Sequence, residues 1–404
     1  MKVAIVLSGG GSRGAYQIGV WKALKKLRIK YNIVTGTSVG ALNGVLMTQK
    51  NYKKAYKLWS NMNFNVVFDQ NTSNNMNVTD TKKIVKTYAK NIVFEGGMNA
   101  VNLYEAIEKL VDEDKVLKSN IDFGLVTVKY PRLKSLSLTK NEIPKGKLKD
   151  YLIASASCFP AFQKKEIEKE YYIDGGYYDN LPINLACKMG AEQIIAVDLD
   201  AVGLKRKTKY KNVDVKIIKS KHDLGSFLIF DSYLSNKNIF YGYTDTLKEY
   251  GKLDGEIFTF KKHQANKIYK KYEHKFFDKL KKILNIENER NSLKKIIKDK
   301  TFKKVFDNDK KTLLDTIEKL GVIYEMDDTK IYRISKYNKI LLDKINIVEI
   351  NNINGALKSL KLLEKKKLVK YIYIKINEGS DDLMFLATMF KKEFLCALYI
   401  EIIK

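Results

Sequence analysis

The amino-acid sequence predicts a layered α/β fold with a central, mostly parallel sheet flanked by helices, followed by a lysine-rich α+β C-terminal domain. Strand-like and helix-like segments alternate up to about residue 260, which is the pattern of a parallel sheet covered by helices. Near residue 263 the composition changes, and lysines begin to separate aromatic and aliphatic residues at helical spacing. We therefore expect a first domain over residues 1–262 and a second over residues 263–404.

The first strand and helix are joined by a glycine-rich stretch. Residues 2–7, "KVAIVL", form a short apolar run that is typical of a buried strand. Apolar residues then recur on one helical face from Ala15 to Leu27. The intervening "SGGGSRG" thus lies at a helix start, where unpaired backbone N–H groups favour a bound negative charge.

That glycine loop has two interpretations. Gly9, Gly11 and Gly14 satisfy the G-x-G-x-x-G pattern of a dinucleotide site, which also needs an acidic residue about 20 positions further on. The first acidic residue of the chain is Asp69, and no Gly-Lys-Ser/Thr follows as a P-loop would require. A dinucleotide-binding oxidoreductase therefore stays only as an alternative.

The second interpretation comes from a pentapeptide further along the chain. A strand-like "YNIV" ends at Val34 and is followed by "TGTSVGALNGVL". Residues 36–40 read G-x-S-x-G between a strand and a helix, which is the pattern of a nucleophile elbow. Ser38 is therefore a candidate nucleophile, and the glycine loop becomes a candidate oxyanion site.

A nucleophilic serine needs a base. The three histidines, His222, His263 and His274, all follow the motif region, and none lies beside a glycine-rich turn. A carboxylate is the other option: Asp174 follows the strand-like "EYYI" and precedes two glycines. On these residues alone, both a histidine base and an aspartate base remain open.

Four segments together resemble the signature of the patatin-like phospholipase family over roughly residues 1–260. They are "GGGSRG" at 9–14, "GTSVG" at 36–40, "ASASCFPAF" at 154–162 and "DGG" at 174–176. The resemblance implies a lipid acyl hydrolase of the phospholipase A or lysophospholipase type, which cleaves carboxylic esters of membrane lipids through an acyl-enzyme. It implies no metal and no cofactor. The implied roles are Ser38 as nucleophile, Asp174 as general base, the N–H groups of Gly9, Gly10 and Gly11 with that of Val39 as oxyanion hole, and Arg13 as the residue that orients the glycine loop.

The formal net charge of +28 is the other strong feature. A basic surface attracts nucleic acid or an anionic membrane, and no helix-turn-helix, zinc-finger or RNP motif is present. We therefore expect a phospholipid or other lipid-ester substrate and an anionic membrane surface as partners, and no specific nucleic acid. Two alternatives remain, which are lysines that merely solvate the surface and a catalytically silent basic membrane-binding module.

Localisation is predicted from what the chain lacks. No apolar run approaches the roughly 18 residues of a membrane span, and the N-terminal run is too short for a signal peptide. The cysteines Cys158, Cys187 and Cys396 are odd in number and widely spaced, which fits a reducing compartment. We expect a cytoplasmic protein attached peripherally to the membrane, with its oligomeric state left open.

The remaining elements follow from local patterns. We expect a hairpin over 123–138 that turns at 130–132, a helix over 182–189, strands at 193–199 and 215–219, and a helix over 234–252. In the second domain we expect a helix after residue 263, a hairpin over 322–334 turning at Asp327 and Asp328, and an apolar helix or helix–strand at 383–403. The aromatic residues of the helix after 263 either lie on a bilayer or pack inside the domain's own core.

Overall fold

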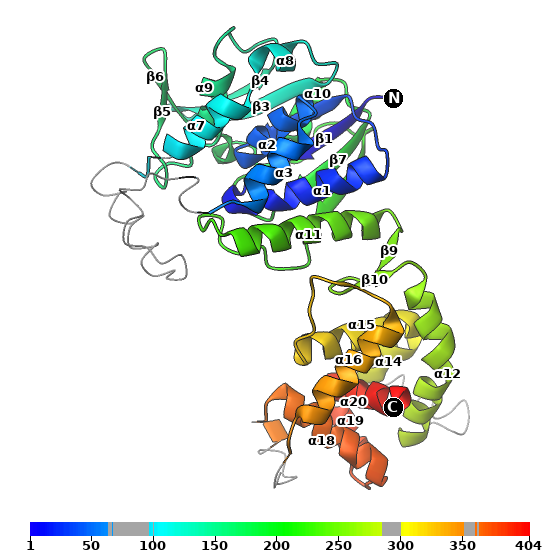
Figure 1. The fold of residues 1–404 in the computed structure, drawn as a ribbon. Helices are drawn as coiled ribbons and strands as arrows, with labels where there is room; N and C mark the ends of the chain where they lie inside the picture. The colour runs from blue at the N-terminus through cyan, green and yellow to red at the C-terminus, as the bar shows by residue number, and fades with distance from the viewer. Residues whose placement is uncertain (64–66, 68–96, 100, 285–299, 351–359, 362) are drawn as a thin grey trace. The chain divides into compact units, whose positions relative to one another are not determined.

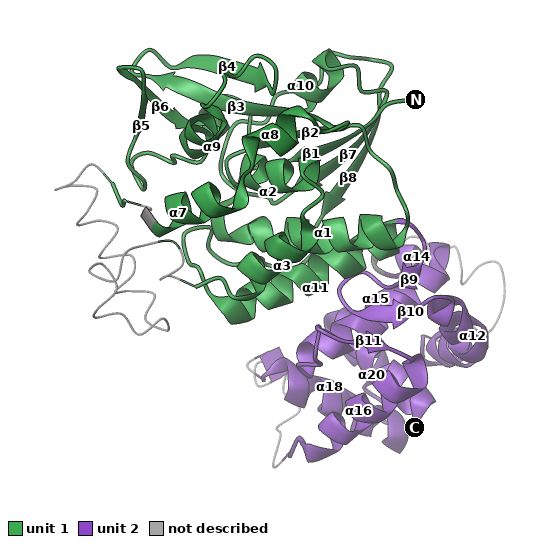
Figure 2. Cartoon of the chain, turned by 45° about the horizontal axis from the view of Figure 1, so that its top comes forward, with its two compact units in different colours: residues 1–249 green, residues 250–404 purple. Residues whose placement is uncertain are grey.

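The computed structural model describes residues 1–63, 67, 97–99, 101–284, 300–350, 360–361 and 363–404 (Figure 1). The chain forms two compact units, Met1–Glu249 and Tyr250–Lys404 (Figure 2). The division thus falls before the change of composition at residue 263. The reason is that the short strands β9 (Leu253–Asp254) and β10 (Thr259–Lys261) share a three-stranded sheet with β11 (Ile331–Tyr332) of the second unit.

Unit 1 is built on one sheet whose strand order is β5-β6-β3-β2-β1-β7-β8, with β4 paired to β3. The pairs among β3, β2, β1, β7 and β8 are parallel, whereas β4, β5 and β6 pair antiparallel. The predicted mostly parallel sheet is confirmed. The strands are β1 (Val3–Leu7), β2 (Ile33–Thr37), β3 (Asp122–Tyr130), β4 (Lys134–Thr139), β5 (Lys165–Ile167), β6 (Glu170–Asp174), β7 (Gln193–Asp198) and β8 (Asp214–Lys219).

Helices cover both faces of this sheet. On one face, Ala4 and Val6 of β1 pack in a cluster with Ile183 and Ala186 of helix α10. Figure 2 shows α10 on one side of the strands and α1 and α11 on the other. The helices of unit 1 are η1 (Gly11–Gly14), α1 (Ala15–Lys26), α2 (Val39–Thr48), α3 (Tyr52–Ser60), α7 (Val101–Leu110), α8 (Glu113–Leu117), α9 (Leu148–Ser155), η2 (Gly175–Tyr177), α10 (Ile183–Lys188) and α11 (Ser232–Glu249).

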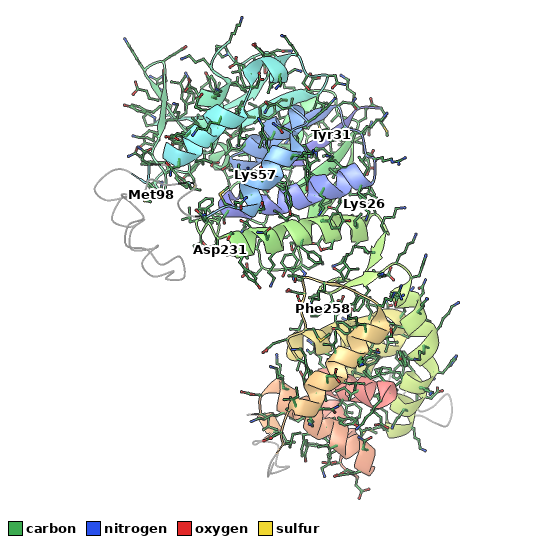
Figure 3. The ribbon with its side chains drawn as sticks, viewed as in Figure 1. Lys26, Tyr31, Lys57, Met98, Asp231 and Phe258 are labelled. Carbon is green, nitrogen blue, oxygen red and sulfur yellow. The ribbon has the colours of Figure 1, made fainter. Side chains whose placement is uncertain are left out.

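Helices α1 and α11 approach each other unusually closely, because each places a glycine against the backbone of the other. A Cβ at Gly19 would lie 2.0 Å from the carbonyl oxygen of Ile239, and one at Gly242 would lie 2.0 Å from that of Tyr16. At the end of α1, the Lys26 ammonium donates to the Tyr243 hydroxyl of α11 at 2.8 Å (Figure 3 labels Lys26). This pair of helices fixes the layer beneath the glycine loop.

The local predictions for unit 1 are confirmed. β3 and β4 form the expected antiparallel hairpin, and α10, β7, β8 and α11 lie where the patterns placed them. The second strand extends further than expected, since β2 continues from Ile33 to Thr37. Ser38 therefore follows the strand end directly.

Unit 2 is mainly helical around its small sheet. Its core includes Phe258 (labelled in Figure 3), which is 2% exposed and packs edge-to-face on Tyr337. The described helices are α12 (Gln264–Ile283), α14 (Lys300–Asp307), α15 (Asp309–Ile323), α16 (Ile334–Ile347), α18 (Lys365–Glu378), α19 (Leu383–Met389) and α20 (Lys391–Ile403). The predicted apolar C-terminal segment is helical, as α19 and α20.

Two expectations for unit 2 are resolved by packing. The apolar face of α12 lies inside the unit, because Ile268, Phe276, Phe277 and Leu280 are buried in its core cluster. The hairpin expected over 322–334 is wrong: α15 occupies its start, and β11 pairs in parallel with β10 instead. Within the described ranges, no helix combines the length and apolarity needed to cross a membrane.

Candidate active site

Ser38 occupies a sharp turn between β2 and α2. Its backbone has φ 56° and ψ −130°, a left-handed conformation that a side chain rarely adopts. A Cβ at Gly36 would lie 2.2 Å from the carbonyl oxygen of Gly40, and a Cβ at Gly40 would lie 2.3 Å from that of Leu7. Both glycines of the pentapeptide are therefore required by close backbone contact, as in a nucleophile elbow.

Asp174 is hydrogen-bonded to the Ser38 side chain. Its carboxylate also accepts the N–H of Gly176 at 2.7 Å, and the side chain is only 5% exposed. Burial raises the pKa of Asp174 to about 6, although the hydrogen bonds from Ser38 and Gly176 favour the charged form and act in the opposite direction. The carboxylate is thus ionised near neutral pH and basic enough to accept a proton.

Strand β3 brings these two residues together. Thr37, the last residue of β2, pairs with Val126, and Asp174, the last residue of β6, pairs with the adjacent Thr127. The parallel strand β2 and the antiparallel strand β6 therefore end at neighbouring positions of one template strand. Ser38 directly follows β2, and Asp174 is the last residue of β6. The two residues meet because both strands pair with β3 at these ends.

Two serines of the segment 154–162 hold this geometry. The Ser155 hydroxyl accepts the N–H of Ser38 at 2.9 Å and donates to the carbonyl of Val126 at 2.7 Å. The carbonyl of Ser157 accepts the N–H of Asp174 at 2.8 Å. One short segment at the end of α9 thereby positions both halves of the pair.

The glycine loop supplies free backbone donors. The N–H groups of Gly10, Gly11 and Val39 have no acceptor among the described residues, and these three residues line the same cavity as Ser38. Gly11 has φ 54°, and a Cβ there would lie 2.1 Å from the carbonyl oxygen of Phe227. The loop therefore needs glycine at this position to present its N–H groups.

Gly9 differs from the expectation. Its N–H donates to both the backbone carbonyl and the side-chain Oδ1 of Asn180, each at 3.1 Å, and Gly9 does not line the cavity. Its hydrogen-bonding capacity is already used inside the protein. The free backbone donors at the site are consequently those of Gly10, Gly11 and Val39.

Asn180 is a site residue that sequence reasoning missed. It is 2% exposed and lines the cavity, and its Nδ2 has no hydrogen-bond partner in the described structure. The orientation of the amide is determined by Gly9, whose N–H requires an acceptor, so the oxygen faces Gly9 and the NH₂ group is the unpaired side. The only signal in the sequence was the position of this asparagine shortly after the Asp-Gly-Gly turn. Ser155 was likewise inside a quoted segment but had no assigned role.

Arg13 supports the glycine loop from outside the cavity. Its guanidinium donates to the carbonyls of Leu199, Asp200 and Gly225 at 3.2, 2.8 and 2.7 Å. These contacts tie the loop to the segments that follow β7 and precede α11. The arginine therefore stands where it can orient the loop.

The cavity has a volume of about 690 Å³ and a largely apolar wall beyond the Ser38–Asp174 pair. None of the three histidines lines it; His222 instead stacks on Tyr241 at 3.8 Å. Cys158 does line it, and burial raises the pKa of this thiol to about 12, with the Asp174 carboxylate adding to the effect. The apolar wall comes from α2, α3, α7 and the segment after α9, through Leu42, Leu46, Trp59, Met62, Ile107, Leu110, Val111 and Phe162.

Other site chemistries find less support in this geometry. A dinucleotide site would place its ribose-binding acid at the end of the second strand, where this chain has Thr37 and Ser38. The described residues contain no group of three or more His, Cys, Asp or Glu side chains that could hold a metal ion. An elbow, a buried carboxylate and free N–H groups are the parts that nucleophilic hydrolysis of an ester requires.

Comparison with known proteins agrees with this class. The family model described as patatin-like phospholipase matches residues 5–187. Residues 5–187 therefore match a patatin-like phospholipase domain.

Named relatives match about half of the chain. The chain is 30% identical over 204 residues to lysophospholipase NTE1 of Candida albicans, a match that covers 50% of this chain and 13% of that protein. It is 28% identical over 202 residues to human patatin-like phospholipase domain-containing protein 6, with 49% and 13% covered. The chain thus matches only about an eighth of the length of these relatives. Among solved structures, VipD from Legionella pneumophila aligns with a TM-score of 0.40 and 13% identity over 100% of this chain and 91% of that one.

Proposed function

We propose that this protein is a serine esterase of the phospholipase A or lysophospholipase type, acting through a Ser38–Asp174 dyad. The observation that carries the proposal is the hydrogen bond between these two side chains, which both line a largely apolar cavity. A carboxylate with a pKa of about 6 can accept a proton and return it near neutral pH. The absence of every histidine from the cavity lining favours the aspartate as the base.

The chemistry follows from these positions. The Ser38 hydroxyl oxygen attacks the ester carbonyl carbon while its proton passes to Asp174. The resulting oxyanion accepts hydrogen bonds from the N–H groups of Gly10, Gly11 and Val39. The intermediate collapses with the proton going to the leaving alcohol or lysolipid, and an acyl-Ser38 ester remains. Water, deprotonated by Asp174, then hydrolyses that ester and regenerates the free serine.

The substrate class follows from the shape and lining of the cavity. Its apolar wall offers a continuous surface to a fatty acyl chain, while Ser38, Asp174 and the free N–H groups lie at the ester. Burial of each CH₂ group contributes about 0.8 kcal/mol, so an acyl chain gains far more from this wall than a short acid does. Lipid esters are therefore the preferred substrates.

The test is covalent labelling with a fluorophosphonate probe, which reacts with activated serines. We expect labelling at Ser38 in the full-length protein and none in Ser38→Ala. The parent protein that has not been treated with the probe should release free fatty acid from a lysophospholipid, whereas the labelled protein and Ser38→Ala should not. Labelling that persisted in Ser38→Ala, or an unlabelled protein, would contradict the proposal.

A further inference from the structure

The segment 201–211, "AVGLKRKTKYK", is here called the interface loop. Two of its apolar side chains face water, since Val202 is 88% exposed and Leu204 is 59% exposed. Single exposed apolar residues are ordinary. These two are different because both also line the cavity that contains Ser38. The loop thus places apolar groups at the opening of the proposed acyl site.

The loop is held in place by the segment that carries Asp174. The N–H of Leu204 donates to the carbonyl of Gly176 at 2.9 Å, and its own carbonyl accepts the N–H of Asn180. The Arg206 guanidinium lies over the Tyr178 ring at 3.8 Å and donates to that residue's carbonyl at 3.1 Å. The exposed apolar pair is therefore presented on an anchored backbone.

Unpaired cations follow the apolar pair. Lys205 is neutralised by Asp198 at 2.8 Å. Lys207, Lys209 and Lys211 are exposed and form no ion pair with the described residues, and the loop contains no acidic residue. Apolar groups beside free lysines match the two layers of a lipid surface, which are the acyl boundary and the anionic headgroups.

We propose that the interface loop docks the protein on an anionic lipid bilayer, with Val202 and Leu204 at the acyl boundary and Lys207, Lys209 and Lys211 against the headgroups. A nucleic acid would satisfy the lysines but offers no partner for Val202 and Leu204, so the bilayer accounts for more of the loop. Docking would bring the cavity opening to the lipid layer, and in this sense the inference rests on the proposed lipid-ester activity.

The test measures binding of the full chain to sedimented vesicles. The loop variant replaces Lys207, Lys209 and Lys211 by Gln. The matched control replaces Lys30, Lys118 and Lys145 by Gln, which are also exposed and form no ion pair with the described residues. Lys30 and Lys118 precede β2 and β3, whereas Ser38 follows the opposite end of β2. Both variants lose the same net charge, so a difference between them reports position.

With vesicles of phosphatidylcholine and phosphatidylserine, the loop variant should lose on the order of 100-fold in affinity, from three lysines near a charged surface. The control should lose several-fold at most. A second variant, Val202→Ser with Leu204→Ser, should bind more weakly than the parent even at high salt, where charge attraction is screened. Unchanged melting temperatures would show that the variants fold.

Three results would overturn the inference. The first is an equal loss of vesicle affinity in the loop and control variants. The second is that the parent protein binds pure phosphatidylcholine vesicles as well as anionic vesicles at low salt. The third is that the parent protein binds duplex DNA more tightly than vesicles and does so through the loop. Binding is measured without turnover, so it does not depend on Ser38. A chain that bound through the loop but hydrolysed no ester would refute the proposed function and leave the docking surface intact.

Discussion

Ser38 and Asp174 share a hydrogen bond because the strands that carry them end at Val126 and Thr127 of the same strand. Asp174, the proposed base, is thus fixed by the sheet rather than by a flexible loop. The serine is also fixed, since its left-handed backbone is held between two glycines and its N–H is bound by Ser155. Five measurements test what this arrangement implies.

Removing either member of the pair should abolish ester hydrolysis. Ser38→Ala deletes the attacking oxygen, and Asp174→Asn keeps the shape but cannot accept a proton. The double variant should be no worse than the single ones, because the two groups act as a unit. Near-normal turnover by Asp174→Asn would return a histidine base to consideration.

Activity should rise with pH through a midpoint near 6. Below that value the raised pKa of Asp174 keeps the carboxyl protonated, and it then cannot accept the Ser38 proton. The pH profile of kcat/KM on a short-chain ester measures this. Asp179 provides a control, because burial also raises its pKa to about 6 although it does not line the cavity. A midpoint that moved in Asp179→Asn would assign the titration to that residue.

Ser155→Ala should lower kcat more than it raises KM. The change leaves the N–H of Ser38 and the carbonyl of Val126 without their shared partner, and an unsatisfied buried group costs about 1–3 kcal/mol. Ser157→Ala is the matched control, since the Ser157 hydroxyl donates to the carbonyl of Ile153 and hydrogen-bonds Tyr104, but makes no hydrogen bond to Ser38 or Val126. Equal losses of kcat in the two variants would argue for a general loss of stability.

The unpaired amide of Asn180 should act as a further donor to the substrate. Asn180→Asp keeps an acceptor for Gly9 but lacks the NH₂ group, whereas Asn180→Ala lacks both. We expect both variants to lose kcat by about 10²–10³, the usual cost of one oxyanion donor. Should Asn180→Asp stay active while Asn180→Ala does not, the residue would act by holding Gly9 instead.

Excess chelator should leave the rate unchanged. In the proposed mechanism, Asp174 supplies the base, and backbone N–H groups supply the oxyanion stabilisation. The rate on a short-chain ester, with and without EDTA, measures this. Loss of activity that calcium restored would require a metal in the mechanism.

The sequence predicted the elements that local patterns encode. The glycine loop, the elbow and the hairpin of β3 and β4 each have short-range signals, and these were found. Contacts between residues far apart in the chain could not be predicted from these local patterns. Nothing near Gly9 indicates that its N–H binds Asn180, and nothing near Ser155 indicates that it holds Ser38.

The hairpin predicted over 322–334 is wrong for the same reason. This segment alternates like a hairpin, but the partner of β11 is β10, which lies some 70 residues earlier in the chain. The helix over 264–283 was predicted, whereas the burial of its aromatic face depended on other helices of unit 2. Local patterns predict which elements form, and tertiary contacts decide what those elements face.

The strand order has a consequence for biosynthesis. β1 lies between β2 and β7, so a growing chain cannot complete the centre of its sheet until residue 198 has been made. Asp174 likewise reaches Ser38 only after β6 has paired with β3. Such non-local pairing is slow compared with helix formation. The Ser38–Asp174 pair therefore assembles late, and a truncated or partly folded chain carries Ser38 without Asp174 beside it.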